Sequence, residues 1–208
     1  MNRATLAAVA VAGALAGVAT AYFLTRTEPA PPVLERATLF EAPRPLPAIA
    51  LQDQSERTFD LGRMRGHWTL LFFGFTNCPD VCPTTLATLA EVRRQLADLP
   101  PDELPEVVLA TVDPVRDTPA ALARYVAHFD PSFTGITGSR ESIEAFTRDL
   151  GVVVMIGEPA ADGSYTVDHS AAVFLVDPTA AFTALFSAPH DAATIARDYR
   201  RIVSARPQ

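Results

Sequence analysis

The sequence predicts an α/β domain with a largely parallel core sheet. Two observations predict it. Apolar runs of strand length alternate with segments of helical period along most of the chain. Two of the runs, residues 68–75 and 107–112, are apolar at nearly every position, as in strands buried on both faces. Alternating strands and helices form an α/β fold, and 208 residues suffice for one such domain with additional segments.

The first 26 residues differ from the rest of the chain. Residues 4–24 hold no charged side chain, and Arg3 and Arg26 flank them. A helix of this length spans roughly 30 Å, the thickness of one hydrocarbon core. We therefore expect residues 1–26 to form a single transmembrane anchor; the alternative is a signal peptide cut after Ala21. Either segment implies export, and the anchor implies a single-pass protein of the cell inner membrane with its soluble domain in the periplasm.

Residues 27–44 follow the predicted anchor. Their prolines, at positions 29, 31, 32 and 43, favour an extended, semi-rigid chain. We expect a linker here, and one domain over residues 45–208. The formal net charge of −7 disfavours a broad nucleic-acid surface, which needs a basic patch.

The first half of the domain begins with two short segments, residues 49–52 and 58–61, which predict a hairpin. The apolar run 68–75 predicts a buried strand. Residues 84–96 predict a helix, because apolar side chains recur at helical spacing. The run 107–112 predicts a second buried strand, parallel to the first through a right-handed crossover.

Capping residues mark the next two helices. Thr118 and Pro119 predict a helix start, with an N-cap followed by proline at the first helical position, and this helix runs to about residue 128. Ser139 predicts the N-cap of a helix over residues 140–150. The remaining elements are expected to be strands at residues 152–156, 171–176 and 182–186, and a final helix at residues 192–203.

The two cysteines of the chain, Cys78 and Cys82, lie between the first buried strand and the helix that follows it. Such a pair can form a disulfide, transfer electrons or bind a soft metal ion. A disulfide closing so short a loop removes little entropy from the unfolded chain, which disfavours a purely stabilising role. Pro83 predicts that Cys82 lies at or just before the N-terminus of the helix, where the free N–H groups and the dipole stabilise a thiolate.

Two thiolates leave a metal ion short of ligands, so a third is needed. His169 immediately precedes the apolar strand 171–176. If this strand pairs antiparallel with residues 68–75, His169 and the cysteine loop share one rim of the sheet. The other histidines, His67, His128 and His190, are interpreted as ordinary surface or edge residues.

Three further residues are interpreted as structural. Asp113 ends the second buried strand on the same rim; it can tune the thiols or recognise a partner, but a turn cap is the preferred reading. Asp80 is expected to be an exposed turn residue, although its carboxylate can also be a weak oxygen ligand. Met155 lies in an apolar run and is expected in the core.

Three ordered motifs carry a resemblance to a known family. They are Phe-Gly-Phe-Thr-Asn-Cys-Pro-Asp-Val-Cys-Pro at 73–83, Thr-Val-Asp-Pro-Val-Arg-Asp-Thr-Pro at 111–119 and Tyr-Thr-Val-Asp-His-Ser at 165–170. In these motifs the chain resembles the Sco/SenC family of copper-binding, thioredoxin-like proteins, over about residues 45–203. Asn77 departs from the family pattern, since many relatives carry histidine there; it is not one of the family's metal ligands.

The resemblance implies a thioredoxin-like fold with an N-terminal hairpin, and copper, as Cu(I) or Cu(II), bound by Cys78, Cys82 and His169. It implies a copper chaperone that delivers its cargo to the copper A site of cytochrome c oxidase. Another periplasmic copper chaperone is the expected donor. Alternatively, Cys78 and Cys82 form a redox-active pair, assisted by a thiol reductant, that keeps the copper A cysteines reduced, or the protein is a copper or redox sensor. A metallochaperone is preferred over an enzyme.

Overall fold

The computed structural model describes residues 2, 12–17, 20, 32–158, 160 and 165–205. The chain divides into two compact units, Met1–Pro32 with Pro207–Gln208, and Val33–Arg206. The predicted anchor lies mostly outside the described residues; residues 12–17 and 20 are helical. Among the described residues, no helix has both the length and the apolar character needed to cross a membrane.

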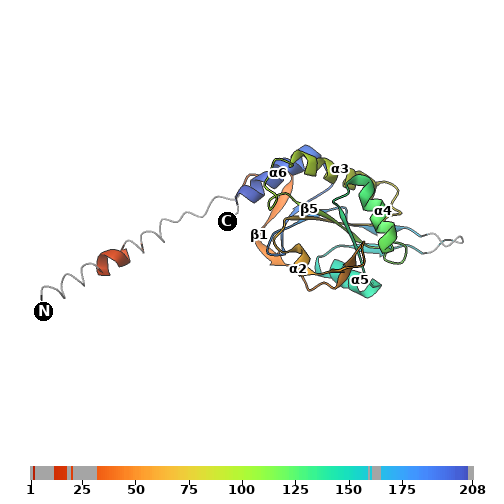
Figure 1. Ribbon diagram of the computed structural model, residues 1–208, viewed down its shortest axis with the longest axis horizontal. Helices are drawn as coiled ribbons and strands as arrows, with labels where there is room; N and C mark the ends of the chain where they lie inside the picture. The colour runs from red at the N-terminus through yellow and green to blue at the C-terminus, as the bar shows by residue number, and fades with distance from the viewer. Residues whose placement is uncertain are drawn as a thin grey trace. The chain divides into compact units, whose positions relative to one another are not determined.

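The unit Val33–Arg206 is built on an eight-stranded sheet with the order β1-β10-β9-β4-β5-β6-β2-β3, and a separate two-stranded sheet of β7 and β8 (Figure 1). The strands are β1 (Ala37–Pro45), β2 (Leu51–Asp53), β3 (Thr58–Phe59), β4 (Thr69–Gly74), β5 (Glu106–Thr111), β6 (Thr134–Thr137), β7 (Val154–Ile156), β8 (Val167–His169), β9 (Val173–Val176) and β10 (Ala181–Phe186). The helices are α2 (Leu61–Met64), α3 (Val81–Gln95), α4 (Pro119–Phe129), α5 (Arg140–Asp149) and α6 (Ala192–Ser204).

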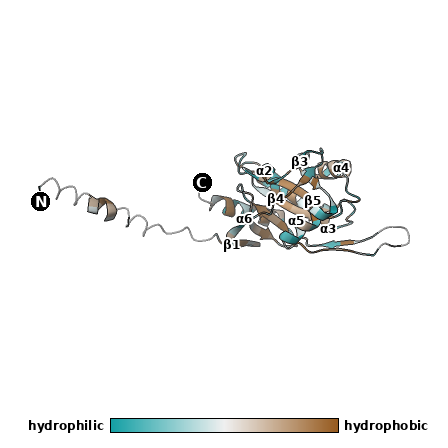
Figure 2. Ribbon diagram, turned by 90° about the horizontal axis from the view of Figure 1, so that it is seen from below, coloured by the Kyte–Doolittle hydropathy of each residue, from teal (hydrophilic) through white to brown (hydrophobic). Residues whose placement is uncertain are grey.

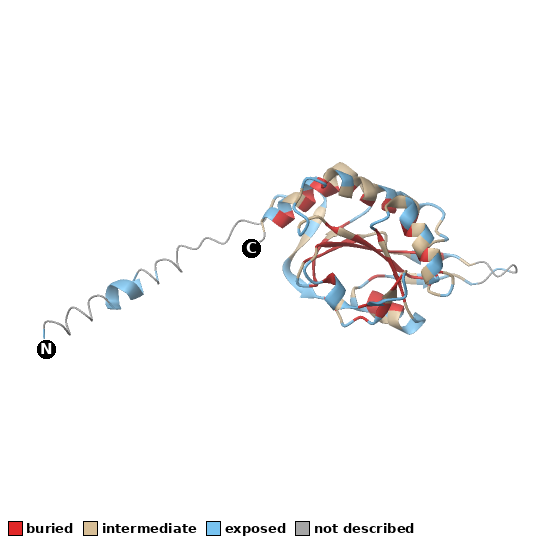
Figure 3. Cartoon of the chain, viewed as in Figure 1, coloured by how far each residue is buried: buried red, intermediate tan, exposed pale blue. Residues whose placement is uncertain are grey.

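Helices cover both faces of the main sheet. α3, α4 and α6 lie on one side, and α2 and α5 lie on the other (Figure 1). The hydrophobic strands run through the middle of the domain (Figure 2), and the buried positions concentrate on them and on the helix faces turned toward them (Figure 3). This layering confirms the predicted α/β class. The prediction of a largely parallel sheet is wrong, because only β4–β5 and β5–β6 pair in parallel, and the other pairs of the main sheet are antiparallel.

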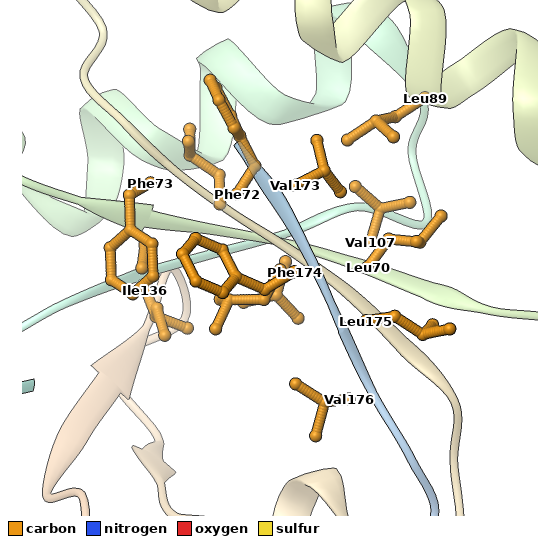
Figure 4. Close-up of a cluster of buried hydrophobic side chains, with 14 of the residues drawn as sticks. Leu70, Phe72, Phe73, Leu89, Val107, Ile136, Val173, Phe174, Leu175 and Val176 are labelled. Atoms are coloured by element: carbon orange, nitrogen blue, oxygen red, sulfur yellow. The ribbon is translucent and has the colours of Figure 1, made fainter. Parts of the chain in front are cut away.

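β4 is the centre of the core, and all of its residues are buried. Successive strand residues point to opposite faces, so Phe72 and Phe73 belong to different layers of the core. Phe73 packs against Phe174 of β9, with ring centroids 5.6 Å apart (Figure 4). A strand buried on both faces explains the continuous apolar run in the sequence.

The pairing around β4 determines where the candidate site residues lie. β4 and β5 are parallel, from Thr69 opposite Glu106 to Gly74 opposite Thr111. β4 and β9 are antiparallel, with Phe72 opposite Val173. The end of β4 and the start of β9 therefore lie at the same rim of the sheet, which confirms the predicted antiparallel pairing.

The predicted linker is wrong in its second half. Residues Ala37–Pro45 form β1, which pairs antiparallel with β10. Phe40 packs on Phe182 with ring centroids 4.6 Å apart. β1 is an edge strand with a register shift between Leu39 and Arg44. Proline costs little at a free edge or a bulge, so the proline content that predicted a linker is compatible with a strand.

Other elements differ from the sequence predictions in smaller ways. β6, β8 and α2 were not predicted, since they are short. The strand expected at residues 152–156 is β7, which pairs with β8 outside the main sheet. Met155 is 60% exposed, so the expectation of a core residue is wrong. In a two-stranded hairpin, one face of the strand remains open to solvent.

Candidate metal centre

The cysteine loop joins β4 to α3. Asp80 occupies the N-cap position of α3 and is exposed, as predicted, and Cys82 is the second residue of the helix. The N–H of Cys82 donates to the sulfur of Cys78 across 3.4 Å. Pro83 does not exclude Cys82 from the helix, which corrects the predicted boundary. Residues of the first turn have no acceptor within the helix for their N–H groups, so proline is tolerated there.

Cys82 is fully buried, whereas Cys78 is half-buried, and both are free thiols. Burial raises the pKa of the Cys82 thiol, and the hydrogen-bonding interaction with Cys78 raises it further. Burial of the sulfur therefore opposes the predicted stabilisation of a Cys82 thiolate. The effect of desolvation on a fully buried sulfur exceeds the effect of the helix N-terminus.

Gly74 allows the sulfur of Cys82 to approach the end of β4. A Cβ atom at position 74 would lie 3.0 Å from the Cys82 Sγ, 3.0 Å from the Phe72 ring and 3.2 Å from a Leu109 methyl group. These distances are shorter than ordinary contacts of about 3.5–4.0 Å. A side chain at position 74 would therefore force the Cys82 sulfur or its neighbours to shift.

His169 is the last residue of β8, where it pairs with Val154 of β7. Its Nε2 lies 3.4 Å from the Cys82 Sγ, and its Nδ1 lies 3.1 Å from the Ser170 carbonyl oxygen. A carbonyl oxygen only accepts, so Nδ1 carries the hydrogen in this bond. This arrangement leaves the Nε2 lone pair directed toward the cysteine side of the site.

The surroundings of His169 favour its neutral form. The rings of Phe72 and Phe75 lie edge-on to the imidazole, each with a centroid separation of 5.9 Å. Burial lowers the pKa of His169, and its contact with the Ser170 carbonyl opposes that shift. A neutral imidazole is the form that binds metal ions.

The ligand atoms of Cys78, Cys82 and His169 all lie within 4.8 Å of one another. The structure thus brings together the three residues that the sequence singled out, from two segments far apart in the chain. Among the described residues, no other group of three or more His, Cys, Asp and Glu side chains converges in this way. Two sulfurs and one imidazole nitrogen form a soft donor set, suited to Cu(I) among biological metals.

A cavity of about 660 Å³ lies beside this group. Cys78 and His169 line it, so the site is open on that side. Three exposed carboxylates, those of Asp80, Glu158 and Asp168, also lie on its walls. The cavity therefore joins the potential ligands to an acidic, accessible surface.

Asp113 belongs to a network at the same rim. It is 2% exposed, forms an ion pair with Arg116, and accepts a hydrogen bond of 2.6 Å from the Tyr165 hydroxyl. The Arg116 guanidinium carbon lies 3.8 Å from the centroid of the Tyr165 ring. The network joins the end of β5 to the segment that enters β8, so the interpretation of Asp113 as a simple turn cap is wrong.

Asp117 is a buried residue that the sequence reasoning missed. It accepts hydrogen bonds from the Thr76 backbone, the Thr76 hydroxyl and the Thr111 hydroxyl, at 3.0, 2.6 and 2.6 Å. Burial raises the pKa of its carboxyl group, although these hydrogen bonds act in the opposite direction. Asp117 lies within the motif at residues 111–119, but nothing in that motif shows that its side chain supports the loop before Cys78.

The remaining histidines divide into two kinds. His128 is exposed, and His67 is partly exposed with a side chain that is 45% accessible, as expected for surface or edge residues. His190 is half-buried and hydrogen-bonds to the carbonyl oxygen of Ala171, on the segment that follows His169. The interpretation of His190 as an ordinary surface residue is therefore incomplete.

Comparison with known proteins agrees with this geometry. A family model described as SCO1/SenC matches residues 46–204. Protein SCO2 homolog, mitochondrial, of Bos taurus is 41% identical over 157 residues, 76% of this chain and 59% of the relative. A putative copper-binding protein of Stutzerimonas stutzeri is 37% identical over 161 residues, 76% of this chain and 77% of the relative. The match thus spans about three fifths of the length of the bovine relative.

Solved structures show the same fold. Arabidopsis thaliana ScoI with copper bound has a TM-score of 0.71 at 31% identity, covering 76% of this chain and 98% of that one. Yeast Sco1 with copper bound has a TM-score of 0.73 at 28% identity, covering 79% and 91%. Together with the family match over most of the sequence, these similarities show that the chain belongs to the SCO1/SenC family.

Proposed function

We propose that this protein is a copper chaperone, which holds one copper ion as cargo through Cys78, Cys82 and His169 and delivers it to the copper A site of cytochrome c oxidase. The observation that carries the proposal is the convergence of two sulfurs and one imidazole nitrogen within 4.8 Å, beside an open cavity. The related Arabidopsis and yeast structures with copper bound support the choice of metal.

The donor set explains how cargo is held and released. Thiolates suit Cu(I), and imidazole suits either oxidation state. Because Cys82 is a buried thiol with a raised pKa, copper binding must displace its proton. Cys78 and His169 line the cavity, so a thiolate of the partner can approach from that side and replace one ligand at a time.

The surface around the cavity supports transfer to another protein. Val81 on the cavity wall is an exposed apolar side chain, as is Val115 in the turn after β5. Exposed apolar groups beside a site are typical of interaction surfaces. Since the cavity walls carry three carboxylates, the partner surface should combine an apolar centre with basic residues.

We also propose that the protein is anchored in the cell inner membrane with its copper domain in the periplasm. The uncharged segment at residues 4–24 supports this location. There, a copper-donating chaperone and a thiol reductant would supply the cargo and keep Cys78 and Cys82 reduced. An alkaline phosphatase fusion after residue 205 should be active in the periplasm; activity only of a cytoplasmic reporter at this position would contradict the location.

The decisive experiment compares wild type with His169→Ala, in Cu(I) binding and in copper transfer from the full chain to an apo copper A domain. His169→Ala loses the nitrogen ligand, so its Cu(I) affinity should fall by more than the roughly tenfold effect of an outer-shell change. Its two thiols should still titrate with a thiol reagent. His128→Ala, which removes an exposed histidine of α4, is the matched control. Tight copper binding that is indifferent to His169 would refute the three-ligand site.

A second candidate function is thiol–disulfide reduction of the copper A cysteines. It is favoured by the unequal exposure of the two free thiols. The Cys78 thiolate would attack the target disulfide, Cys82 would then attack the mixed disulfide, and the target would leave as a dithiol with two electrons. The Cys78–Cys82 disulfide so formed would need an external dithiol to reduce it.

The two functions are separated by different substitutions. Reduction predicts that Cys82→Ser traps a mixed disulfide between Cys78 and the target, and that His169→Ala reduces the target at the wild-type rate. Mass spectrometry of the trapped species and a thiol count on the target would measure both. Copper transfer without any trapped species would favour the chaperone.

A further inference from the structure

His190 lies in the turn between β10 and α6, outside the proposed copper ligands. β10 pairs with β9, with Phe186 opposite Val173. The chain leaving β10 therefore passes the segment that enters β9. This register explains how the Nε2 of His190 comes to lie 2.7 Å from the carbonyl oxygen of Ala171.

The hydrogen bond assigns a tautomer to His190. The carbonyl oxygen of Ala171 only accepts, so Nε2 must carry the hydrogen. Nδ1 is buried and has no hydrogen-bond partner in the part of the chain that the structure describes. The ring is therefore held through one bond, and that bond ends on the backbone of Ala171.

The Ala171 carbonyl, which accepts from His190, lies next to the Ser170 carbonyl, which orients His169. The Ser170 carbonyl accepts from the Nδ1 of His169 at 3.1 Å, and the next carbonyl along the chain, that of Ala171, accepts from His190. Ser170 is also held from the other side: its N–H donates to the Val153 carbonyl at 3.1 Å, and its hydroxyl oxygen accepts from the Val153 N–H at 3.2 Å. Val153, just before β7, thus holds the peptide group on one side of the Ser170 carbonyl, and the β10–α6 turn holds the peptide group on the other side.

We propose that His190 is a positioning residue for the copper site. By fixing the Ala171 carbonyl, it keeps the adjacent Ser170 carbonyl in place, and so directs the Nε2 of His169 toward the two sulfurs. It forms no hydrogen bond with Cys78, Cys82 or His169, and it acts through the backbone. This inference rests on the proposed function, because it requires His169 to be a copper ligand.

Two isosteric substitutions test the proposal. A glutamine amide nitrogen reaches the position of Nε2, whereas an asparagine amide nitrogen reaches only that of Nδ1. His190→Gln therefore retains the donor to Ala171, and His190→Asn loses it. In the full chain, with Cu(I) supplied from a bicinchoninate buffer, His190→Asn should bind copper about tenfold more weakly than wild type. It should also shift the thiolate-to-copper absorption of the Cu(II) form, whereas His190→Gln should match wild type in both.

Controls separate positioning from general stability. His128→Asn, at an exposed position of α4, should leave copper affinity unchanged. Equal copper affinities of His190→Gln and His190→Asn, whether like wild type or equally weakened, would overturn the proposal. So would a histidine NMR spectrum of the unaltered chain showing the hydrogen of His190 on Nδ1, a measurement that requires no variant to fold. A wild-type chain that binds no copper would instead overturn the proposed function, and this inference with it.

Discussion

At the scale of a single residue, substitution of Gly74 tests how far the position of the Cys82 sulfur in the proposed copper site depends on close packing. Gly74→Ala would place a methyl group 3.0 Å from the Cys82 Sγ, and overpacking of this kind costs about 1–3 kcal/mol. We expect the sulfur to move, so that copper affinity falls along with the free energy of unfolding. Urea unfolding and Cu(I) competition titrations would measure the two effects.

Gly135 of β6 is the matched control for Gly74. A Cβ atom there would lie 3.0 Å from Leu122 and 3.3 Å from Val126, both on α4. Gly135→Ala should therefore destabilise the fold by a similar amount, about 1–3 kcal/mol, without changing copper affinity. If both variants lowered copper affinity equally, the loss would reflect global stability and not the position of Cys82.

Tyr165 and Tyr125 provide a second matched pair of single-residue substitutions. Tyr165 donates to the buried carboxylate of Asp113, so Tyr165→Phe should lower the free energy of unfolding by about 1–2 kcal/mol. The Tyr125 hydroxyl is buried without a partner in the described part of the chain, so Tyr125→Phe should be neutral or stabilising. Urea denaturation of both variants provides the comparison, and a larger loss for Tyr125→Phe would contradict it.

The sequence was sufficient to predict which residues converge at the site, but not their chemical state. Cys78, Cys82 and His169 are recognisable because motifs surround them. The thiol state of Cys82 depends on how deeply the sulfur is buried beneath β4, which local sequence does not show. The bond of His190 to Ala171 depends on the register between β9 and β10, so nothing near position 190 indicates it.

At the scale of elements, the turn after β5 and the β7–β8 hairpin frame the site. Arg116 of the turn stacks on Tyr165, close to the start of β8. Val115, beside it, is 63% exposed. Val115→Asp should therefore slow copper transfer to the apo copper A domain without changing copper affinity, because a carboxylate would lose its water in the apolar part of the proposed docking surface.

Val33 provides the control, because it is 85% exposed in the segment before β1. Val33→Asp adds the same charge to the same residue type, and it should leave the transfer rate at the wild-type value. Stopped-flow measurements with both variants at low and moderate salt would test the prediction. Equal rates for the two variants would show that the surface around Val115 does not contact the partner.

Helices and strands were predicted correctly where the hydrophobic pattern or the capping signal was strong. They were missed where the segment was short or lay at the edge of the sheet. The buried strands β4 and β5 and the capped helices α4 and α5 correspond to strong local signals. β1 was missed because prolines favour extended chain whether or not it pairs. Its pairing with β10 is a tertiary property, stabilised by contacts such as Phe40 with Phe182.

For the whole domain, Asp198 of α6 is the residue that joins the start of β1 to the body of the fold. Its buried carboxylate accepts hydrogen bonds from the backbone N–H groups of Glu35, Arg36 and Ala37. Asp198→Ala would leave these donors without an acceptor, at a cost of about 3 kcal/mol. Urea unfolding should show this loss, and hydrogen exchange should show faster exchange over residues 35–45.

The exposed carboxylate of Asp98 also contacts α6, through Arg200, and serves as the comparison. Asp98→Ala should change stability little, because an exposed ion pair contributes little. The prediction for Asp198 fails if the two variants are equally stable. Such a result would mean that β1 pairs with β10 independently of this carboxylate.

The antiparallel register of β4 and β9 determines when, during synthesis and folding, the three side chains of the site come together. The two sulfurs and His169 are separated by almost half the sequence, and the pairing of β4 with β9 brings them to one rim. A chain that is still being synthesised, or has lost this pairing, offers copper two sulfurs without the nitrogen. In the proposed site, a complete set of ligands therefore exists only after the domain has folded.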